Sequence, residues 1–218
     1  FERWLAGRLG LSGDRIIVNG PGKTKSMLAR AVDMRVKLIN IDGLGEIDLI
    51  AAEARRASRP QPVGVRVVTS VGWSSQFGLP ISSGDAFSAF AQMRENPWLV
   101  PVGLHLHLGT GIRTVHTYLR AVQELLDFSR SINDRLGIEL YVFDLGGGFA
   151  VPTVRSIDEW DDHMVSLGYP LLEAFPGDCP APSDYAGPIK AIFDGATRSN
   201  GTPHEIILEP GRAITSGA

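Results

Sequence analysis

Cysteine is nearly absent from this sequence, since Cys179 is the one cysteine among 218 residues. A single cysteine excludes an intrachain disulfide framework and is typical of a protein kept in a reducing compartment. No apolar run approaches the roughly 20 residues that are needed to span a bilayer, and no signal peptide is recognisable. We therefore expect a cytoplasmic protein without a membrane partner.

Neither sign of charge is in excess, because 21 Lys and Arg residues face 24 Asp and Glu residues, for a net charge of −3. A nucleic-acid-binding domain needs a basic surface, so we expect no nucleic acid as a partner. With 44% hydrophobic residues, the chain suffices for one domain that buries roughly 70% of its unfolded surface.

Apolar, β-rich runs alternate along the chain with segments of helical period, which predicts parallel βαβ units. Strands are expected at 15–19, 37–42, 63–69, 99–108, 140–145 and 205–208, and helices at 24–35, 45–57, 83–96, 114–135 and 186–199. Two α/β architectures fit this alternation. One is an open doubly wound sheet, and the other is a (β/α)8 TIM barrel with about six units present and its first strands missing.

Polar and glycine-rich residues repeatedly fall at the carboxyl ends of the predicted strands, at 105–107, 144–148 and 209–212. Several strands that contribute to one face favour the barrel. The segment 151–185 is long and holds five prolines, so we expect it to pass over the strand ends.

Three consecutive glycines, Gly146 to Gly148, come directly after the strand-like run 140–143. Each glycine costs roughly 0.5–1 kcal/mol in chain entropy relative to alanine, so the triplet indicates a need for bare backbone. Exposed backbone N–H groups at a strand end form an anion site that phosphate commonly occupies. A tight turn at a crowded strand end is the alternative, and the triplet alone does not decide between them.

The segment 19–24 lies between a strand and a helix, where a nucleotide-binding P-loop would lie. That motif requires a glycine at position 17, which is Ile17 in this sequence. We therefore interpret the segment as a strand-to-helix turn, with Lys23 near the start of the helix.

His105 and His107 lie two residues apart on a predicted strand, so their side chains share one face. The pair could ligate a metal, as in barrel hydrolases, but a catalytic metal usually needs a third ligand. Hydrogen-bonded core histidines or an aromatic platform for a flat ligand are the other readings, and the sequence predicts no metal.

Glu209 ends the last predicted strand, and Arg212 follows after a turn. The two charges could form a structural ion pair. Alternatively, arginine's forked donors suit phosphate, while a carboxylate aimed at a heterocyclic nitrogen would keep that nitrogen protonated.

Three motifs occur in order along the sequence: HLHLGTG at 105–111, FDLGGGF at 143–149 and EPGR at 209–212. Together they resemble the barrel domain of the fold-type III pyridoxal-phosphate decarboxylases. This family includes diaminopimelate, ornithine and arginine decarboxylases, and its barrel is of the alanine-racemase type. The segments 40–46 and 75–78 are also similar to the family's pattern. The resemblance implies pyridoxal 5′-phosphate as the cofactor and a basic or diamino amino acid as the substrate that loses CO₂.

The resemblance also implies roles for individual residues. His107 would stack on the cofactor ring and Glu209 would pair with the ring nitrogen, which makes these two the catalytic candidates. The other cofactor-binding candidates are Arg66, Thr110, Gly146, Gly147, Gly148, Gly211 and Arg212.

Departures from the family pattern are Gln76 in place of a lysine and Thr110 in place of a serine. The family's Schiff-base lysine would lie upstream of Phe1, and its C-terminal β domain would begin after Ala218. We therefore expect residues 1–218 to be part of a barrel domain that is inactive alone, within a homodimeric full-length enzyme. A non-catalytic relative that binds the cofactor and a metal-dependent hydrolase using His105 and His107 remain alternatives.

Overall fold

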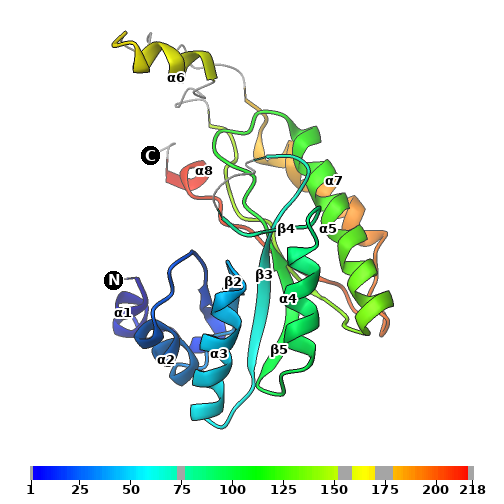
Figure 1. Ribbon diagram of the computed structural model, residues 1–218. Helices are drawn as coiled ribbons and strands as arrows, with labels where there is room; N and C mark the ends of the chain where they lie inside the picture. The colour runs from blue at the N-terminus through cyan, green and yellow to red at the C-terminus, as the bar shows by residue number, and fades with distance from the viewer. Residues whose placement is uncertain (1, 73–76, 152–158, 170–178, 216–218) are drawn as a thin grey trace.

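The computed structural model describes residues 2–72, 77–151, 159–169 and 179–215, and its centre is a sheet of parallel strands (Figure 1). Six of these strands form the continuous sheet: β1 (Ile17–Val18), β2 (Leu38–Ile41), β3 (Gln61–Val68), β5 (Leu99–His105), β6 (Val142–Asp144) and β7 (Glu205–Ile207). A seventh, β4 (Leu79–Pro80), pairs with the end of β3 outside this path.

The strand order identifies the architecture. The strands lie in the order β1-β2-β3-β5-β6-β7, which is also their order along the chain. A doubly wound sheet reverses its order at a switch point, whereas a barrel adds each strand beside the preceding one. The absence of a reversal among the described strands decides for the barrel, so the predicted incomplete TIM barrel is confirmed as a half-barrel of six strands.

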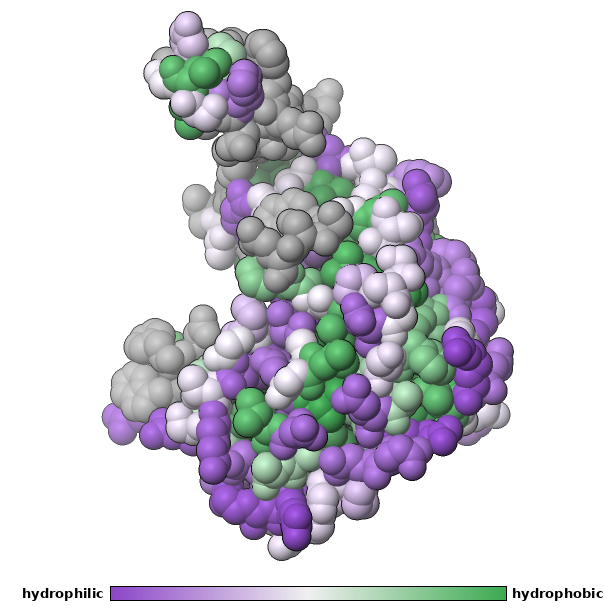
Figure 2. Space-filling model, in the orientation of Figure 1, coloured by the Kyte–Doolittle hydropathy of each residue, from purple (hydrophilic) through white to green (hydrophobic). Residues whose placement is uncertain are grey.

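Helices connect the strands and cover the sheet (Figure 1). Their bounds are α1 (Glu2–Arg8), η1 (Gly13–Arg15), α2 (Lys25–Asp33), α3 (Gly45–Arg56), α4 (Asp85–Arg94), α5 (Val115–Leu136), α6 (Glu159–Ser166), α7 (Pro182–Asp194) and α8 (Arg212–Thr215). In Figure 2, hydrophilic side chains predominate along the rim of the molecule, and apolar ones gather between α3 and α4. No helix in the described part of the chain is long and apolar enough to cross a membrane.

Helix α5 shows how the sequence sets these elements. Its buried side chains, including Tyr118, Leu125 and Ile132, recur at helical spacing and face the core. The helix ends at Gly137, whose φ of +68° suits glycine and whose N–H donates to the Asn133 carbonyl at 2.8 Å.

Two predicted boundaries differ clearly from the structure. The strand expected at 99–108 ends at His105, because its partner β6 ends at Asp144 and Gly146 then turns with a φ of +61°. The helix expected at 186–199 is α7 at Pro182–Asp194. Pro182 starts this helix because proline fits a first turn, where its missing N–H would have no helical partner.

Candidate cofactor-binding site

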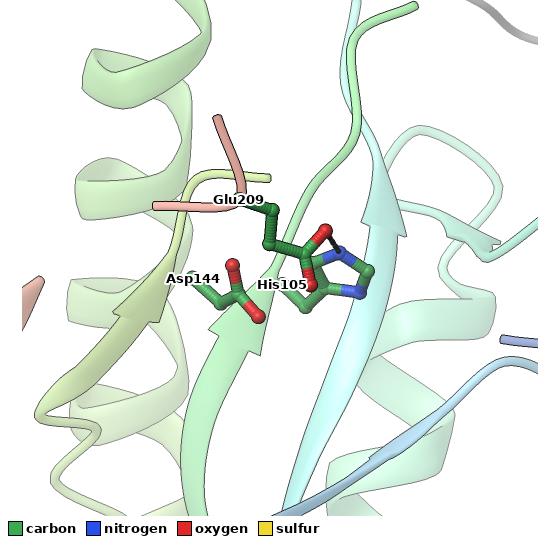
Figure 3. Close-up of side chains that lie close together, drawn as sticks. All are labelled: His105, Asp144 and Glu209. Atoms are coloured by element: carbon green, nitrogen blue, oxygen red, sulfur yellow. Dashed lines mark ion pairs between the residues drawn. The ribbon is translucent and has the colours of Figure 1, made fainter. Parts of the chain in front are cut away.

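Three polar side chains meet at the carboxyl ends of three neighbouring strands (Figure 3). His105 ends β5, Asp144 ends β6, and Glu209 follows β7 after one intervening residue. The His105 Nε2 atom lies 3.9 Å from Glu209 Oε2, and the ligand atoms of all three residues lie within 4.8 Å of one another. His105 and Asp144 are buried, whereas the Glu209 side chain is 37% exposed. Glu209 is therefore the member of the cluster that a ligand can reach.

The histidine of this cluster is held neutral. Burial lowers the pKa of His105 from 6.5 to about 3, and the positive charge of Arg66 adds to the effect, with smaller contributions from His107 and Lys23. Neither ring nitrogen of His105 has a hydrogen-bond partner among the described residues. Such unsatisfied buried nitrogens are costly, so His105 offers hydrogen-bonding capacity that the described part of the chain does not use.

Asp144 carries the opposite shift. Burial raises the pKa of this carboxyl group from 3.8 to about 6, and the neighbouring charge of Glu209 raises it further. Hydrogen bonds from the Gly146 N–H, at 3.1 Å, and from Asn19 oppose this rise because they stabilise the charged form. The two carboxyl groups are thus electrostatically coupled at the base of the site.

Asn19, just after β1, links the two acids. Its Nδ2 donates to Asp144 Oδ2 at 3.2 Å and also to Glu209 Oε1. The sequence analysis assigned no role to Asn19 or Asp144. The available signals were that Asn19 follows a strand and that Asp144 lies two residues before the first glycine of the triplet.

The glycine triplet lies flush against neighbouring loops. A Cβ atom added at Gly146, Gly147 or Gly148 would lie 2.0–2.3 Å from a backbone oxygen, a distance that real Cβ atoms do not adopt. These oxygens belong to Leu106, Glu209 and Gly109 respectively. The crowded strand end considered as an alternative is therefore present, and it brings the triplet against both the β5 and the β7 loops.

The N–H groups of the triplet are not equally available. The Gly146 N–H donates to Asp144 Oδ1, and the Gly147 N–H points to His107 Nδ1 at 3.4 Å. The Gly148 N–H donates to no described residue. A phosphate cradle would thus rely first on Gly148, and the exposed Thr110 lies beside it, since a Cβ on Gly148 would be 3.6 Å from the Thr110 nitrogen.

His107 and Arg66 border the same site. Burial lowers the pKa of the half-buried His107, as does the charge of Arg66, while Glu209 raises it. Arg66, on β3, donates to Asp42 Oδ1 at 3.3 Å, and its guanidinium group lies 5.2 Å from the Phe77 ring centre. Arg66 lies beside His105 in the sheet, and its positive charge lowers the pKa of both histidines.

The remaining predicted residues are partly described. Gly211 and Arg212 follow Glu209 and its adjoining proline at the start of α8, where Gly211 has a φ of +48° and Arg212 is exposed. Gln76 lies outside the described residues, as does much of the segment 151–185. The described part of that segment includes α6, which lies away from the sheet at the top of Figure 1.

The geometry also bears on the metal interpretation. Within the described residues, the one group of three or more potential metal ligands combines His105 with Asp144 and Glu209 and does not include His107. The Asn19 amide already donates to both carboxylates of this group. One oxygen of each carboxylate, Asp144 Oδ2 and Glu209 Oε1, is thus already engaged in a hydrogen bond.

The residues present fit a flat, phosphorylated, heterocyclic cofactor. Glu209 offers a reachable carboxylate, and His107 offers the face of its imidazole ring. Gly148 offers a backbone N–H group that lies next to Thr110 and its hydroxyl group. These groups converge on the carboxyl edge of a parallel barrel sheet, where barrel enzymes carry their active sites. Fold and site together define a barrel protein that binds a cofactor.

The chain belongs to the pyridoxal-dependent decarboxylase family, because the profile of that family's pyridoxal binding domain matches residues 2–216. The pyridoxal cofactor inferred from the sequence is therefore confirmed as that of the family.

Similar proteins include two diaminopimelate decarboxylases. The one from Actinosynnema pretiosum subsp. auranticum is 33% identical, and the one from Aquifex aeolicus is 26% identical; in each case the match covers 100% of this chain. The matches cover 46% and 47% of those relatives, so the chain spans about half of their length. The crystal structure of the Methanocaldococcus jannaschii diaminopimelate decarboxylase in complex with L-lysine superposes with a TM-score of 0.80 at 22% identity. The superposition covers 98% of this chain and 46% of that one, and it supports the fold.

Proposed function

We propose that this chain supplies most of the cofactor-binding barrel of a pyridoxal-phosphate-dependent decarboxylase that acts on a basic or diamino amino acid. Among diaminopimelate, arginine and ornithine, diaminopimelate is the first candidate, since the relatives matched along the whole chain include the two diaminopimelate decarboxylases named above. The observation that carries the proposal is the convergence of Glu209, His107 and the glycine triplet on one edge of the half-barrel.

Glu209 would hold the ring nitrogen of the cofactor protonated. Its carboxylate is reachable from the mouth of the barrel, and its backbone N–H donates to the Gly146 carbonyl at 2.7 Å. That bond fixes the backbone of Glu209 relative to the triplet. When bound, pyridoxal phosphate supplies the electron sink for the electron pair that CO₂ leaves behind.

His107 would cover one face of the ring. Because the pKa of His107 is lowered, its imidazole is neutral at neutral pH and packs on a positively charged ring without charge repulsion. Arg66 would add a cation near the same ring. The Gly148 N–H, the Thr110 hydroxyl, the Gly211 backbone and the Arg212 guanidinium would bind the phosphate, with bare backbone and forked donors suited to its oxygens.

We further propose that residues 1–218 form one partial barrel domain and that the complete protein adds further strands, a C-terminal β domain and the lysine that anchors the cofactor. It would work as a homodimer in the cytoplasm on a small amino acid. The single cysteine of the chain supports a reducing compartment.

The experiment is cofactor binding and CO₂ release by the complete protein. We expect the absorbance spectrum of added pyridoxal phosphate to change on binding. Arg212→Met and Glu209→Gln should each weaken binding roughly tenfold or more, as expected for lost charge-assisted hydrogen bonds. The matched control is Arg94→Met on α4, where the arginine is exposed and pairs with its neighbour Glu95 at 3.0 Å.

Release of labelled CO₂ from diaminopimelate, arginine or ornithine then identifies the substrate. Cofactor binding without CO₂ release from any amino acid would indicate the non-catalytic relative. Stoichiometric zinc in the purified protein, without a spectral change on addition of pyridoxal phosphate, would contradict the proposal and favour the hydrolase.

A further inference from the structure

The Asn19 side chain makes three hydrogen bonds with one amide group. Its Oδ1 accepts from Asn40 Nδ2 at 2.7 Å, and its Nδ2 donates to Asp144 Oδ2 at 3.2 Å and to Glu209 Oε1. Because Asn40 binds the carbonyl end of the amide, the NH₂ end must face the two carboxylates. Asn40 thereby determines which way round the Asn19 amide lies.

Asn40 is itself fixed by the sheet. It is 1% exposed and lies on β2 opposite Gly64 of β3. A Cβ atom added at Gly64 would lie 2.1 Å from Asn40 Oδ1, so the glycine leaves the room that the amide occupies. Residues on or next to β1, β2 and β3 therefore form one chain of contacts, called here the relay. Gly64 packs against Asn40, Asn40 donates to Asn19, and Asn19 donates to the two acids.

Glu209 depends on this relay for its orientation. Its backbone is bonded to Gly146, so the freedom that remains is in the side chain. Among the described residues, Asn19 is the one whose side chain donates a hydrogen bond to this carboxylate, since His105 Nε2 is 3.9 Å away. The like charge of Asp144 would otherwise favour rotation of Glu209 toward solvent.

We propose that Asn19 is a positioning residue that aims the Glu209 carboxylate at the ring nitrogen of the cofactor, and that Asn40 and Gly64 keep the Asn19 amide in the required orientation. This inference rests on the proposed function. Asn19, Asn40 and Gly64 would not themselves touch the cofactor but would act on it through Glu209.

The test compares two ligands that differ at the ring nitrogen alone. Pyridoxine 5′-phosphate has an alcohol in place of the aldehyde, so it cannot bond covalently to a lysine. Its analogue with C–H in place of the ring nitrogen retains the phosphate and the ring. Binding of both to the complete protein would be followed by tryptophan fluorescence, for the unsubstituted protein, Asn19→Ala, Glu209→Ala and the double variant.

We expect Asn19→Ala to weaken pyridoxine phosphate about tenfold and to change the affinity for the C–H analogue less than twofold. In the Glu209→Ala background the same substitution should have no further effect. Gly64→Ala leaves Asn19 in the sequence but would displace the Asn40 side chain that holds it, so it should reproduce the selective loss of affinity for pyridoxine phosphate. Thermal unfolding confirms that each variant is folded.

Equal losses for the two ligands would show that Asn19 is only structural and would overturn the inference. An undiminished effect of Asn19→Ala in the Glu209→Ala background would overturn it as well, because Asn19 would then act independently of Glu209. If the unsubstituted protein bound neither ligand, the proposed function would itself be contradicted and the inference would fall with it.

Discussion

Asp144 shows how the site works at the scale of a single residue. Its carboxyl group is fully buried beside another carboxylate, and the hydrogen bonds from Gly146 and Asn19 only partly offset the cost of its charge. The folded protein consequently binds a proton at Asp144 more tightly than the unfolded chain does.

The sign of the resulting pH effect follows from the raised pKa. Protonated Asp144 stabilises the fold most below pH 3.8, and this contribution is lost as the pH rises to about 6. The full shift corresponds to about 3 kcal/mol in the free energy of unfolding. We expect Asp144→Asn, which cannot ionise, to lack this loss between pH 4 and pH 6.

Chemical denaturation of both proteins across this range measures the difference. His105 titrates in the opposite sense, so the comparison is made between variant and unsubstituted protein and not along one curve. Asp134→Asn, the same substitution at an exposed position of α5, is the matched control. Parallel curves for Asp144→Asn and the unsubstituted protein would contradict the assignment.

Sequence reasoning identified the residues of the site that belong to local patterns. Glu209, His107 and the glycine triplet each follow a strand within a recognisable motif. Asn19 carries no such motif, and the two acids to which it donates lie 125 and 190 residues away. Contacts of that kind depend on the order in which strands join the sheet, which local sequence does not encode.

At the scale of elements, the glycine triplet after β6 lies where helices α5 and α7 meet the ends of the neighbouring strands. Tyr118 of α5 donates its hydroxyl to the Gly147 carbonyl, and the Tyr118 ring stacks on Phe149 at 4.8 Å. Tyr185 of α7 packs edge-on against both rings and donates to the Ile112 carbonyl at 2.8 Å. The glycine-rich loop is thus packed between α5 and α7 on one side and the segments that follow β5 and β7 on the other.

Gly147→Ala tests whether this clamping requires glycine. The φ of Gly147 is not positive, so alanine meets no backbone strain there, but its Cβ would lie 2.1 Å from the Glu209 carbonyl oxygen. We expect a loss of about 1–3 kcal/mol in the free energy of unfolding, as for other overpacked sites. Movement of Glu209 should also weaken cofactor binding.

The matched control is Gly7→Ala in α1, where an added Cβ meets nothing within 4 Å and no proline follows the glycine. Alanine inside a helix should stabilise the protein by roughly 0.5–1 kcal/mol, which is the opposite sign. Urea denaturation measures the free energy of unfolding of both variants. An unchanged free energy for Gly147→Ala would mean that the loop after β7 can move to accommodate the added Cβ.

The ends of the elements were predicted less well than their existence. Each of the six strands of the continuous sheet was expected, because hydrophobic periodicity indicates which face of an element is buried. The helices α2, α3, α4, α5 and α7 were expected as well, whereas α6 was not. Strand ends depend on the partner strand, as at His105, and the two-residue strand β4 pairs with β3 without a pattern of its own. The proline-rich start of α7 was read as loop.

At the scale of the whole molecule, the half-barrel has two edge strands, β1 and β7. Exposed apolar side chains lie at the β7 end of the sheet: Ile206 on β7, Leu208 just after it and Ile214 on α8. A cavity of about 390 Å³ lies between them and α7. Exposed apolar strand edges favour further pairing. The proposed additional strands of the complete barrel would lie between β7 and β1 and cover both.

Hydrogen exchange tests this arrangement. In residues 1–218 expressed alone, we expect backbone amides of β1 and β7 to exchange about tenfold faster, or more, than those of β3, because β3 is buried between two neighbours and the edge strands have one each. In the complete protein the difference should largely disappear, since both edges would be paired. The amides of α5 serve as an internal control, because its hydrogen bonds lie within the helix and should not depend on barrel closure. Equally slow exchange of β1, β3 and β7 in the shorter chain would contradict the open half-barrel, and persistently fast exchange of β7 in the complete protein would contradict the proposed closure.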